Sequence, residues 1–394
     1  MRAEIDGPAG TIEMKPSVPR LRIAQVAPPI EAVPPTGYGG TERVVYELVR
    51  GLHERGHRVT TFASGDSTVP GELVPTVERA LRTEGFGGDP SAYVLRTMAR
   101  LEDRLGDFDV VHLHLEAHNP EALRRAEGHI AAVATFHGRL DLPWAREGLA
   151  SAGPGIVAIS ASQALPHPGL PWAIVPNGLD LTGAPFRAEP GEDLAFVGRI
   201  APEKGVAEAI DLALATGRRL RIAAKAGPTP RERDYNDAVF EPALRAAGTL
   251  VEYLGELPGE DRDQLFSESY ATLMTGHWPE PFGLVAIESM ATGTPVLAMR
   301  VGALPEIVRH GQDGFLGDDV DGLAYFIDEV GGLDRRAIRA SVLDRFSAER
   351  MVDRYEALYV RRLGDLRGAA TRSASAQAAT ATRTRPTSGA SVPR

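Results

Sequence analysis

The chain has 394 residues, of which 43% are hydrophobic, a net charge of −10 at pH 7, and no cysteine. This length predicts two domains rather than a single core, and the acidic balance argues against a general nucleic-acid binder, which needs a basic face for phosphates. Without cysteine, disulfides, thiolate nucleophiles and cysteine-ligated metal sites are excluded, so a metal would need His, Asp or Glu as ligands.

The first twenty residues mix acids with proline and glycine and lack the apolar centre of a secretory signal. We expect residues 1–20 to form an unstructured leader and the protein behind them to be cytoplasmic. The sequence has no run of about 18 apolar residues, the length that a membrane-spanning helix needs. We therefore expect no spanning helix, and a peripheral contact with a membrane stays compatible with the sequence.

Two series of short runs rich in Val, Ile, Ala and Leu follow in chain order, with helical patterns between them. The first series covers residues 21–28, 57–64, 109–115, 131–137 and 155–160, and the second covers residues 193–199, 220–227, 249–255, 271–276 and 294–300. Such runs are typical of strands buried on both faces, as in parallel sheets with crossover helices. The sequence therefore predicts two doubly wound, Rossmann-like α/β domains, over residues 21–180 and 181–345.

The junction of the domains is predicted at residues 176–193, which are rich in proline, glycine and acids and show no periodicity. Because ligands of such sheets bind beyond the carboxyl ends of the strands, two facing sheets would form a cleft between the domains. Apolar residues at helical spacing predict a last helix over residues 346–365 that closes the fold. Residues 366–394 are low in complexity and are predicted to be an unstructured tail.

A glycine-rich loop follows the first predicted strand. Gly37, Gly39 and Gly40 precede a helix that is predicted to begin near Thr41. Glycines let backbone N–H groups approach an anion closely, and the start of a helix favours negative charge. The loop is therefore a candidate site for a diphosphate or a sugar, and a flexible turn before a helix is the alternative. The pattern is not G-x-G-x-x-G, which argues against a nicotinamide site.

Two cations in the second half form another candidate site. Arg199 stands at the end of a predicted strand, and Lys204 follows five residues later at the start of a helix. Both are expected at the carboxyl edge of the sheet, where their side chains suit a diphosphate. A solvated surface pair is the alternative.

The stretch PEPFGLVAIESMATGTPVLA places Glu280 and Glu288 eight positions apart. A helix is predicted over residues 282–291, so Gly283 and Leu284 would offer free first-turn N–H groups to an anion. Carboxylates accept charge-assisted hydrogen bonds from hydroxyl groups. The arrangement therefore predicts a ligand with hydroxyls at both ends and a diphosphate in the middle, which is a nucleotide sugar. An amphipathic helix with acids near its start is the competing interpretation.

These motifs together resemble the retaining glycosyltransferases of family 4 (glycosyl transferases group 1), which have the two-domain GT-B fold. The resemblance rests on the segments GYGGTERVVYELVRGLHERGHRVTTFAS, FHG, IVPNGLD, FVGRIAPEKG and EPFGLVAIESMATGTPVLAMRVGALPEIVRHGQDGFL, and it runs from about residue 21 to residue 363. The last of these segments, in register with the two cations upstream, is the most specific.

The resemblance implies roles at the donor's nucleotide end. Arg199 and Lys204 would bind the donor diphosphate, beside the amides of Gly283 and Leu284. Glu288 would bind the ribose hydroxyls.

The resemblance also implies roles around the transferred sugar. Glu280 would bind hydroxyls of this sugar, and Phe282 is counted with the donor-binding residues. His137 of the FHG motif would approach the same sugar, and the loop of Gly39, Gly40 and Thr41 would close near the phosphates and the acceptor.

Metal and acceptor sites have weaker signals. His112, His114 and His118 have a spacing that suits a metal, but the family has no metal there, so we predict neither a metal nor another cofactor. The segment 160–172 is short and rich in proline where relatives have a longer helix with acceptor-side residues. The acceptor is therefore left open among glycans, lipids and small molecules, and nucleic acid is not expected as a partner.

The sequence thus predicts transfer of a sugar from a nucleoside diphosphate sugar, with a UDP-sugar as the first guess, to a hydroxyl acceptor with retention at the anomeric carbon. Two alternatives stay open. One is a nucleotide-sugar epimerase of the GT-B fold, which would release product from the donor alone. The other is a non-catalytic nucleotide-sugar binder.

Overall fold

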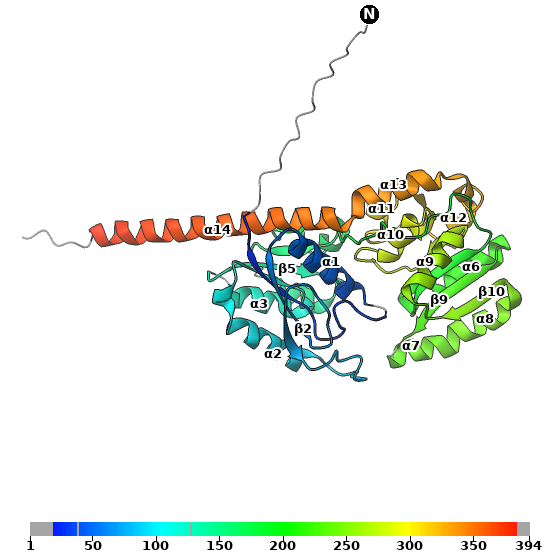
Figure 1. Ribbon diagram of the computed structural model, residues 1–394. Coiled ribbons are helices and arrows are strands. Elements are labelled where there is room, and N and C mark those ends of the chain that lie inside the picture. The colour runs from blue at the N-terminus through cyan, green and yellow to red at the C-terminus, as the bar shows by residue number, and fades with distance from the viewer. Residues whose placement is uncertain (1–18, 38, 127, 151, 228, 384–394) are drawn as a thin grey trace, which may run out of the picture.

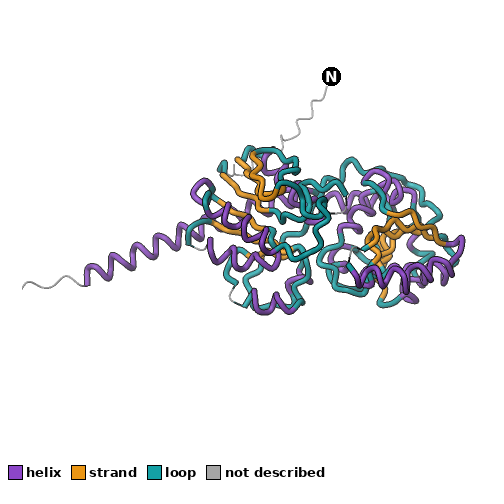
Figure 2. Tube along the Cα trace, turned by 90° about the horizontal axis from the view of Figure 1, so that it is seen from below, coloured by secondary structure: helices purple, strands orange, loops and turns teal. Residues whose placement is uncertain are grey.

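The computed structural model describes residues 19–37, 39–126, 128–150, 152–227 and 229–383. The chain forms two α/β domains that lie next to each other, and one long helix, α14, runs along the first domain (Figure 1). Each domain has its own group of strands with helices packed around it (Figure 2). The leader at 1–18 and the last residues, 384–394, lie outside the described residues.

The first domain is built on a parallel sheet of seven strands in the order β3-β2-β1-β4-β5-β6-β7. The strands are β1 (Arg22–Val26), β2 (Arg58–Ser64), β3 (Glu72–Val77), β4 (Val110–Leu113), β5 (Ala131–Phe136), β6 (Ile156–Ala158) and β7 (Ala173–Ile174). The helices of this domain are α1 (Gly40–Glu54), α2 (Ser91–Glu102), α3 (Asn119–Ala126), α4 (Pro143–Gly148) and α5 (Ala161–Ala164). Every residue of β4 and β5 is buried, as expected of strands covered by helices on both faces.

The second domain has a parallel sheet of six strands in the order β10-β9-β8-β11-β12-β13. The strands are β8 (Leu194–Ile200), β9 (Leu220–Ala226), β10 (Val251–Gly255), β11 (Ala271–Met274), β12 (Val296–Met299) and β13 (Gly314–Gly317). The helices are α6 (Val206–Thr216), α7 (Pro230–Tyr235), α8 (Glu241–Ala247), α9 (Gly259–Glu268), α10 (Leu284–Ala291), α11 (Leu304–Ile307), α12 (Val320–Tyr325) and α13 (Arg335–Phe346). Two Rossmann-like domains with parallel sheets confirm the predicted GT-B fold class.

The last helix, α14 (Ala348–Arg383), returns from the second domain and packs against α1 and β5 of the first. Met351, Val352, Tyr355 and Tyr359 on this helix are buried. The approach of α14 to α1 is close at Gly51, where a Cβ atom would lie 2.6 Å from a side-chain carbon of Val352. The C-terminal helix therefore completes the core of the first domain.

The C-terminal prediction was wrong in one respect. The predicted helix ended at residue 365 and the tail from 366 was expected to be unstructured, but α14 continues to Arg383 and its outer part projects away from the body (Figure 1). The segment after residue 367 is rich in alanine, which has the highest helix propensity, so a helix that is already nucleated on the first domain can extend through it.

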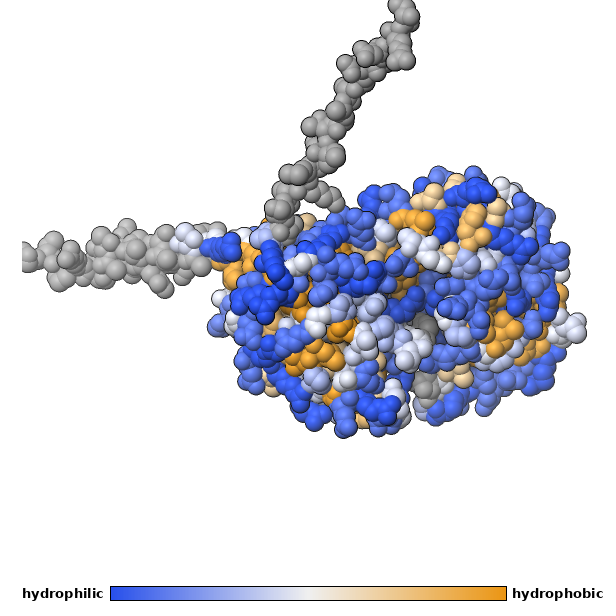
Figure 3. Space-filling view, viewed as in Figure 1, coloured by the Kyte–Doolittle hydropathy of each residue, from blue (hydrophilic) through white to orange (hydrophobic). Residues whose placement is uncertain are grey.

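On the face shown in Figure 3, apolar residues form scattered patches among hydrophilic ones. Within the described ranges, none of the helices is both long and apolar enough to cross a membrane.

Candidate active site

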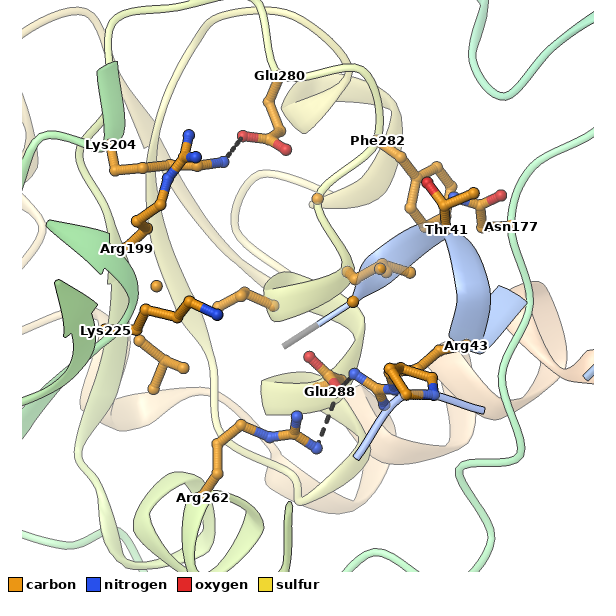
Figure 4. A pocket seen from close by; sticks show the side chains of 18 of the residues that line it. Thr41, Arg43, Asn177, Arg199, Lys204, Lys225, Arg262, Glu280, Phe282 and Glu288 are labelled. Atoms are coloured by element: carbon orange, nitrogen blue, oxygen red, sulfur yellow. Dashed lines mark hydrogen bonds and ion pairs between the residues drawn. The ribbon is translucent and has the colours of Figure 1, made fainter. Parts of the chain in front are cut away.

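A cleft of about 670 Å³ lies between the two domains and receives residues from both. One wall comes from the first domain, with residues 34–37, Gly39, the start of α1, His137 and Asn177. The other wall comes from the second domain, with the ends of β8 and β9, the segment after β11 and the start of α10. Figure 4 shows Arg199, Lys204 and Lys225 on one wall and Thr41 and Asn177 on the other.

All the site residues predicted from the sequence line this cleft. They are Gly39, Gly40, Thr41, His137, Arg199, Lys204, Glu280, Phe282, Gly283, Leu284 and Glu288. The sequence therefore identified residues that the fold brings together from segments up to about two hundred and fifty positions apart. The cleft thus establishes where these residues lie, and the contacts of each residue indicate what it can bind.

The start of α10 presents backbone N–H groups to the cleft. The helix begins at Leu284, two residues later than predicted, and Gly283 precedes it with φ at 103°. No side chain of the described residues caps this helix start, and the N–H of Ala286 donates to the carbonyl of Gly283 at 3.0 Å, so the N–H groups of Leu284 and Val285 stay available to an anion. A residue other than glycine would be strained at this φ, and its Cβ atom would lie 3.1 Å from Leu304.

Phe282 lines the cleft, but its side chain is almost completely buried. It is 2% exposed, and its ring meets the ring of Phe346 edge to face, with centroids 5.6 Å apart. Phe282 therefore anchors the start of α10 to the end of α13, and the contact with a ligand falls to its neighbours.

Lys204 and Glu280 form an ion pair inside the cleft, with 2.7 Å between Nζ and Oε2 (Figure 4). Trp278 donates a hydrogen bond from Nε1 to the same oxygen, also at 2.7 Å, and its ring lies 4.5 Å from the Lys204 ammonium. Gly205 makes this position of Lys204 available, because it adopts φ of 72° against the backbone of Thr275. The cation and the carboxylate are each 18% exposed, so both are open to a ligand.

Arg199 has two carboxylate partners in the structure. Its guanidinium contacts Glu203 and Glu232, each at 2.9 Å. Burial tends to raise the pKa of Glu232, but hydrogen bonds from Thr229 and the charge of Arg199 hold this pKa below its ordinary value. The guanidinium is thus fixed in direction by an ionised neighbour, while its Nε atom is buried without a hydrogen-bond partner among the described residues.

Glu288 is held by an arginine from each domain. Arg43 on α1 contacts Oε1 at 2.5 Å, and Arg262 on α9 contacts the same oxygen at 3.0 Å. Figure 4 shows the two guanidinium groups approaching Glu288 from different sides. The carboxylate is 5% exposed, so two cations compensate a charge that would otherwise be costly to bury.

The glycine loop reaches across the cleft. The helix α1 begins at Gly40, one residue before the predicted start, and a Cβ atom on Gly40 would lie 3.2 Å from the side chain of Leu284. On Gly39, a Cβ atom would lie 2.8 Å from Pro35. The small residues therefore allow the first domain to approach the start of α10 closely.

Glu42 follows in the first turn of α1 and is buried. Burial raises its pKa to about 7, an effect that its backbone hydrogen bond partly offsets. This carboxyl group is therefore partly protonated near neutral pH.

His137 joins the cleft to the interior of the first domain. Its ring Nε2 lies 2.9 Å from Nδ1 of His114, and its backbone N–H donates to Glu116 at 2.8 Å. Burial lowers the pKa of His137 to about 4, so the ring is neutral at physiological pH. Both ring nitrogens of His112 and of His114 take part in hydrogen bonds to protein groups, which gives these two histidines a structural role.

Sequence reasoning missed several residues that shape the cleft. Arg43 stands three positions after Gly40, and residues three apart lie on the same face of a helix. This spacing could have predicted that Arg43 faces the cleft together with Gly40. Glu232 and Arg262 had no comparable pattern in the sequence. Only the fold shows that they converge on the predicted residues.

Comparison with known proteins assigns both domains to glycosyltransferase families. Residues 38–182 match the family described as "Glycosyltransferase Family 4", and residues 184–330 match "Glycosyl transferases group 1". The glycogen synthase of Mycobacterium tuberculosis strain H37Rv is 31% identical over 366 residues, which covers 77% of this chain and 86% of the relative. The D-inositol 3-phosphate glycosyltransferase of Nocardia farcinica is 30% identical over 399 residues, which covers 85% and 87%.

Solved structures show the same architecture. AviGT4, a glycosyltransferase involved in avilamycin A biosynthesis, superposes with a TM-score of 0.62 at 25% identity, covering 87% of this chain and 98% of that one. Anabaena HepE in complex with UDP-glucose superposes with a TM-score of 0.66 at 17% identity, covering 86% and 99%. The catalytic domain of starch synthase IV from Arabidopsis thaliana, bound to ADP and acarbose, gives 0.65 at 16% identity, covering 88% and 100%.

Proposed function

The chain belongs to the glycosyltransferases of family 4, and we propose that it transfers a glycosyl group from a nucleoside diphosphate sugar to a hydroxyl group of an acceptor, with retention at the anomeric carbon. The observation that carries this proposal is the convergence of Lys204, Glu280, Glu288 and the open start of α10 in one interdomain cleft. This set combines positive potential for a diphosphate with carboxylates for hydroxyl groups on both sides of it.

The diphosphate end of the donor fits the second domain. When the bond between the anomeric carbon and the diphosphate oxygen breaks, negative charge develops on the diphosphate. Lys204 and the first-turn N–H groups of α10 can stabilise this charge without reorganisation, because the fold already holds them in place. Arg199 stands on the same wall and adds a third source of positive potential (Figure 4).

The two carboxylates suit the two hydroxyl-bearing parts of the donor. Glu280 stands just outside the start of α10 and would accept hydrogen bonds from the transferred sugar. Glu288 lies about one turn inside the helix, where both arginines contact Oε1. Among the residues that the structure describes, the other oxygen, Oε2, has no hydrogen-bond partner and is not fully buried. It can therefore accept hydrogen bonds from ribose hydroxyls.

The proposed chemistry needs no protein nucleophile. The acceptor oxygen forms a bond to the anomeric carbon on the face that the diphosphate leaves, and the acceptor proton passes to the departing diphosphate oxygen. Cations of the protein and the helix start take the place of a metal in this proposal. Closure of the glycine loop over the start of α10 would exclude water and limit hydrolysis of the donor.

A UDP-sugar is the donor that we propose to test first. One solved structure with this fold is a complex with UDP-glucose and another is bound to ADP, which supports a nucleotide donor without selecting the base. The acceptor is proposed only as a hydroxyl compound, and a cytoplasmic location stays a prediction from the sequence.

A thermal-shift panel of UDP, ADP, GDP and their glucose conjugates tests the donor class. A ligand that binds the native state raises the melting temperature, since it adds RT ln(1 + [L]/Kd) to the stability. We expect one base to give a clear shift, larger for UDP than for ADP or GDP. The absence of a shift with all three nucleotides would contradict the proposal.

Incubation with donor alone separates the proposed activity from its alternatives. An epimerase would convert the donor into a new nucleotide sugar without an acceptor, whereas a transferase leaves it intact or slowly hydrolyses it. A non-catalytic binder would show the thermal shift but no turnover with any of a panel of hydroxyl acceptors.

A further inference from the structure

A chain of buried hydrogen bonds connects His137 in the cleft with the C-terminal helix α14. From His137 Nε2 it passes to His114 (2.9 Å), from His114 to Gln25 on β1 (3.0 Å), and from Gln25 to the hydroxyl of Tyr359 on α14 (3.0 Å). Gln25, His114 and Tyr359 are almost fully buried. The chain therefore lies in a region where no bulk water competes for these groups.

The series of hydrogen bonds continues beyond Tyr359 to a second tyrosine of α14. Tyr359 lies 2.7 Å from Nδ1 of His112, whose Nε2 lies 2.7 Å from the hydroxyl of Thr135. Thr135 lies 2.9 Å from the hydroxyl of Tyr355. Two tyrosines of the last helix thus anchor a polar network that begins in the cleft.

The direction of every proton in the first part of the chain follows from the amide of Gln25. Its Nε2 donates to Tyr359, so its Oε1 accepts, and His114 must donate from Nε2. Burial holds the pKa of His114 well below its ordinary value, so this ring is neutral and carries a single N–H. His114 Nδ1 is therefore an acceptor.

The same logic fixes the proton of His137. Because His114 Nδ1 accepts, His137 must donate from Nε2. His137 is also neutral, which leaves its Nδ1 without a proton. Among the described residues, Nδ1 of His137 has no hydrogen-bond partner. This atom is not fully buried, so it is open to the cleft that the residue lines.

We infer that Gln25, His114 and Tyr359 are positioning residues that fix the tautomer of His137 and so turn an unprotonated Nδ1, a hydrogen-bond acceptor, towards the cleft. Resting on the proposed function, this means that His137 accepts a hydrogen bond from a hydroxyl of the transferred sugar. The last helix of the chain then acts on donor recognition in the first domain without touching the donor.

Nitrogen NMR of the full-length protein, labelled with 15N only in histidine, tests the tautomer without any ligand. The side-chain nitrogens of His137 are assigned by their loss in His137→Asn. We expect Nε2 to be protonated and Nδ1 to be unprotonated. A proton on Nδ1 would overturn the inference, because each hydrogen bond from Gln25 to His137 would then have its donor and acceptor exchanged.

Variants of Gln25 test whether the chain sets the tautomer. Gln25→Met removes the acceptor for His114, so the His137 signals should move towards a mixture of tautomers. Gln25→Glu keeps an oxygen that accepts from His114 and should preserve the wild-type signals. Tyr355→Phe breaks only the far end and is the matched control. If Gln25→Met does not fold, Tyr359→Phe serves instead, since it removes the acceptor that orients the amide of Gln25.

Calorimetric titration with UDP and with UDP-glucose tests the consequence for the sugar. Gln25→Met should weaken UDP-glucose binding on the order of five- to ten-fold while leaving UDP binding unchanged, as expected for loss of one hydrogen bond to the sugar. An equal loss for both ligands, or unchanged His137 signals in Gln25→Met and Tyr359→Phe, would overturn the positioning role. Failure of the wild type to bind UDP would count against the proposed function instead, while the nitrogen signals still decide the tautomer.

Discussion

Arg43 of α1 in the first domain contacts Glu288 of α10 in the second, with 2.5 Å between Nη1 and Oε1. This ion pair crosses the cleft beside the open start of α10, and Arg262 supports the same oxygen from α9. The carboxylate that is proposed to hold the ribose is therefore also a point of contact between the domains. Nucleotide binding and domain closure are expected to act on one group.

Replacing Glu288 with Gln should weaken UDP binding by roughly ten-fold, because a hydrogen bond to a charged group is worth about 1.5–3 kcal/mol and the neutral amide no longer offsets the charge of Arg43. Isothermal titration with UDP measures the effect. Glu54→Gln, an exposed acid on α1, is the control and should bind UDP like the wild type. Wild-type affinity in Glu288→Gln would show that the ribose lies elsewhere.

Lys204→Ala should lower kcat on the order of 10²-fold, by analogy with the loss of one donor to a developing oxyanion. The reason is that Lys204 stands beside the start of α10, where negative charge develops on the leaving diphosphate. Steady-state rates with the active donor measure the loss. Arg300→Ala removes an exposed cation that pairs with Asp318 outside the cleft and serves as the control. Unchanged turnover in Lys204→Ala would contradict its place on the diphosphate.

Glu280→Gln should separate the sugar from the nucleotide. If the carboxylate binds hydroxyls of the transferred sugar, the variant should lose about ten-fold in affinity for UDP-glucose and keep its affinity for UDP. Trp278 and Lys204 would both lose a charged partner, so the melting temperature should be measured in parallel. An equal loss for the two ligands would place Glu280 on the diphosphate side or give it a purely structural role.

Glu42 should make the free energy of unfolding depend on pH. Its folded-state pKa is raised to about 7 from an ordinary value of 4.5, chiefly by burial, with Glu31, Arg82 and Glu116 as the nearby charges. Between pH 4.5 and 7 the folded state therefore holds a proton that the unfolded state has released, so stability falls as pH rises through this window. The full cost is on the order of 3 kcal/mol above pH 7.

The measurement is urea unfolding of the wild type and Glu42→Gln from pH 5 to pH 8. The variant should gain stability relative to the wild type as the pH rises, and the difference should level off above pH 7. All other titratable groups are present in both proteins, so the difference isolates Glu42. Glu54→Gln on the same helix is the control, and a difference that does not change with pH would show that Glu42 carries no raised pKa.

The sequence predicted the strands that are buried on both faces, because continuous apolar runs identify them. It missed β3, β7 and β13, which are short or lie at the edges of the sheets. Their sequences carry Pro75 in β3 and two glycines in β13, residues that ordinarily mark turns or edges. Tertiary pairing overrode these local signals.

The candidate site was also predicted only in part, because the sequence reveals local patterns but not tertiary partners. Residues in contiguous motifs, such as Gly283 and Glu288, could be placed because a helix start fixes where they point. Arg262 and Glu232 could not, because their positions depend on which loops the fold brings beside β8 and α10. The partners of a charge are set by tertiary structure, which leaves no local pattern in the sequence.

The return of α14 to the first domain has a consequence for biosynthesis. Tyr355 and Tyr359 belong to the core of the domain that is translated first, yet the whole of the second domain precedes them along the polypeptide. On the ribosome, the first domain therefore stays incomplete, with the apolar side chains that α14 covers exposed, until α14 has been synthesised. If the gene were divided at the domain junction, the first domain would be produced without α14, the helix that completes its core.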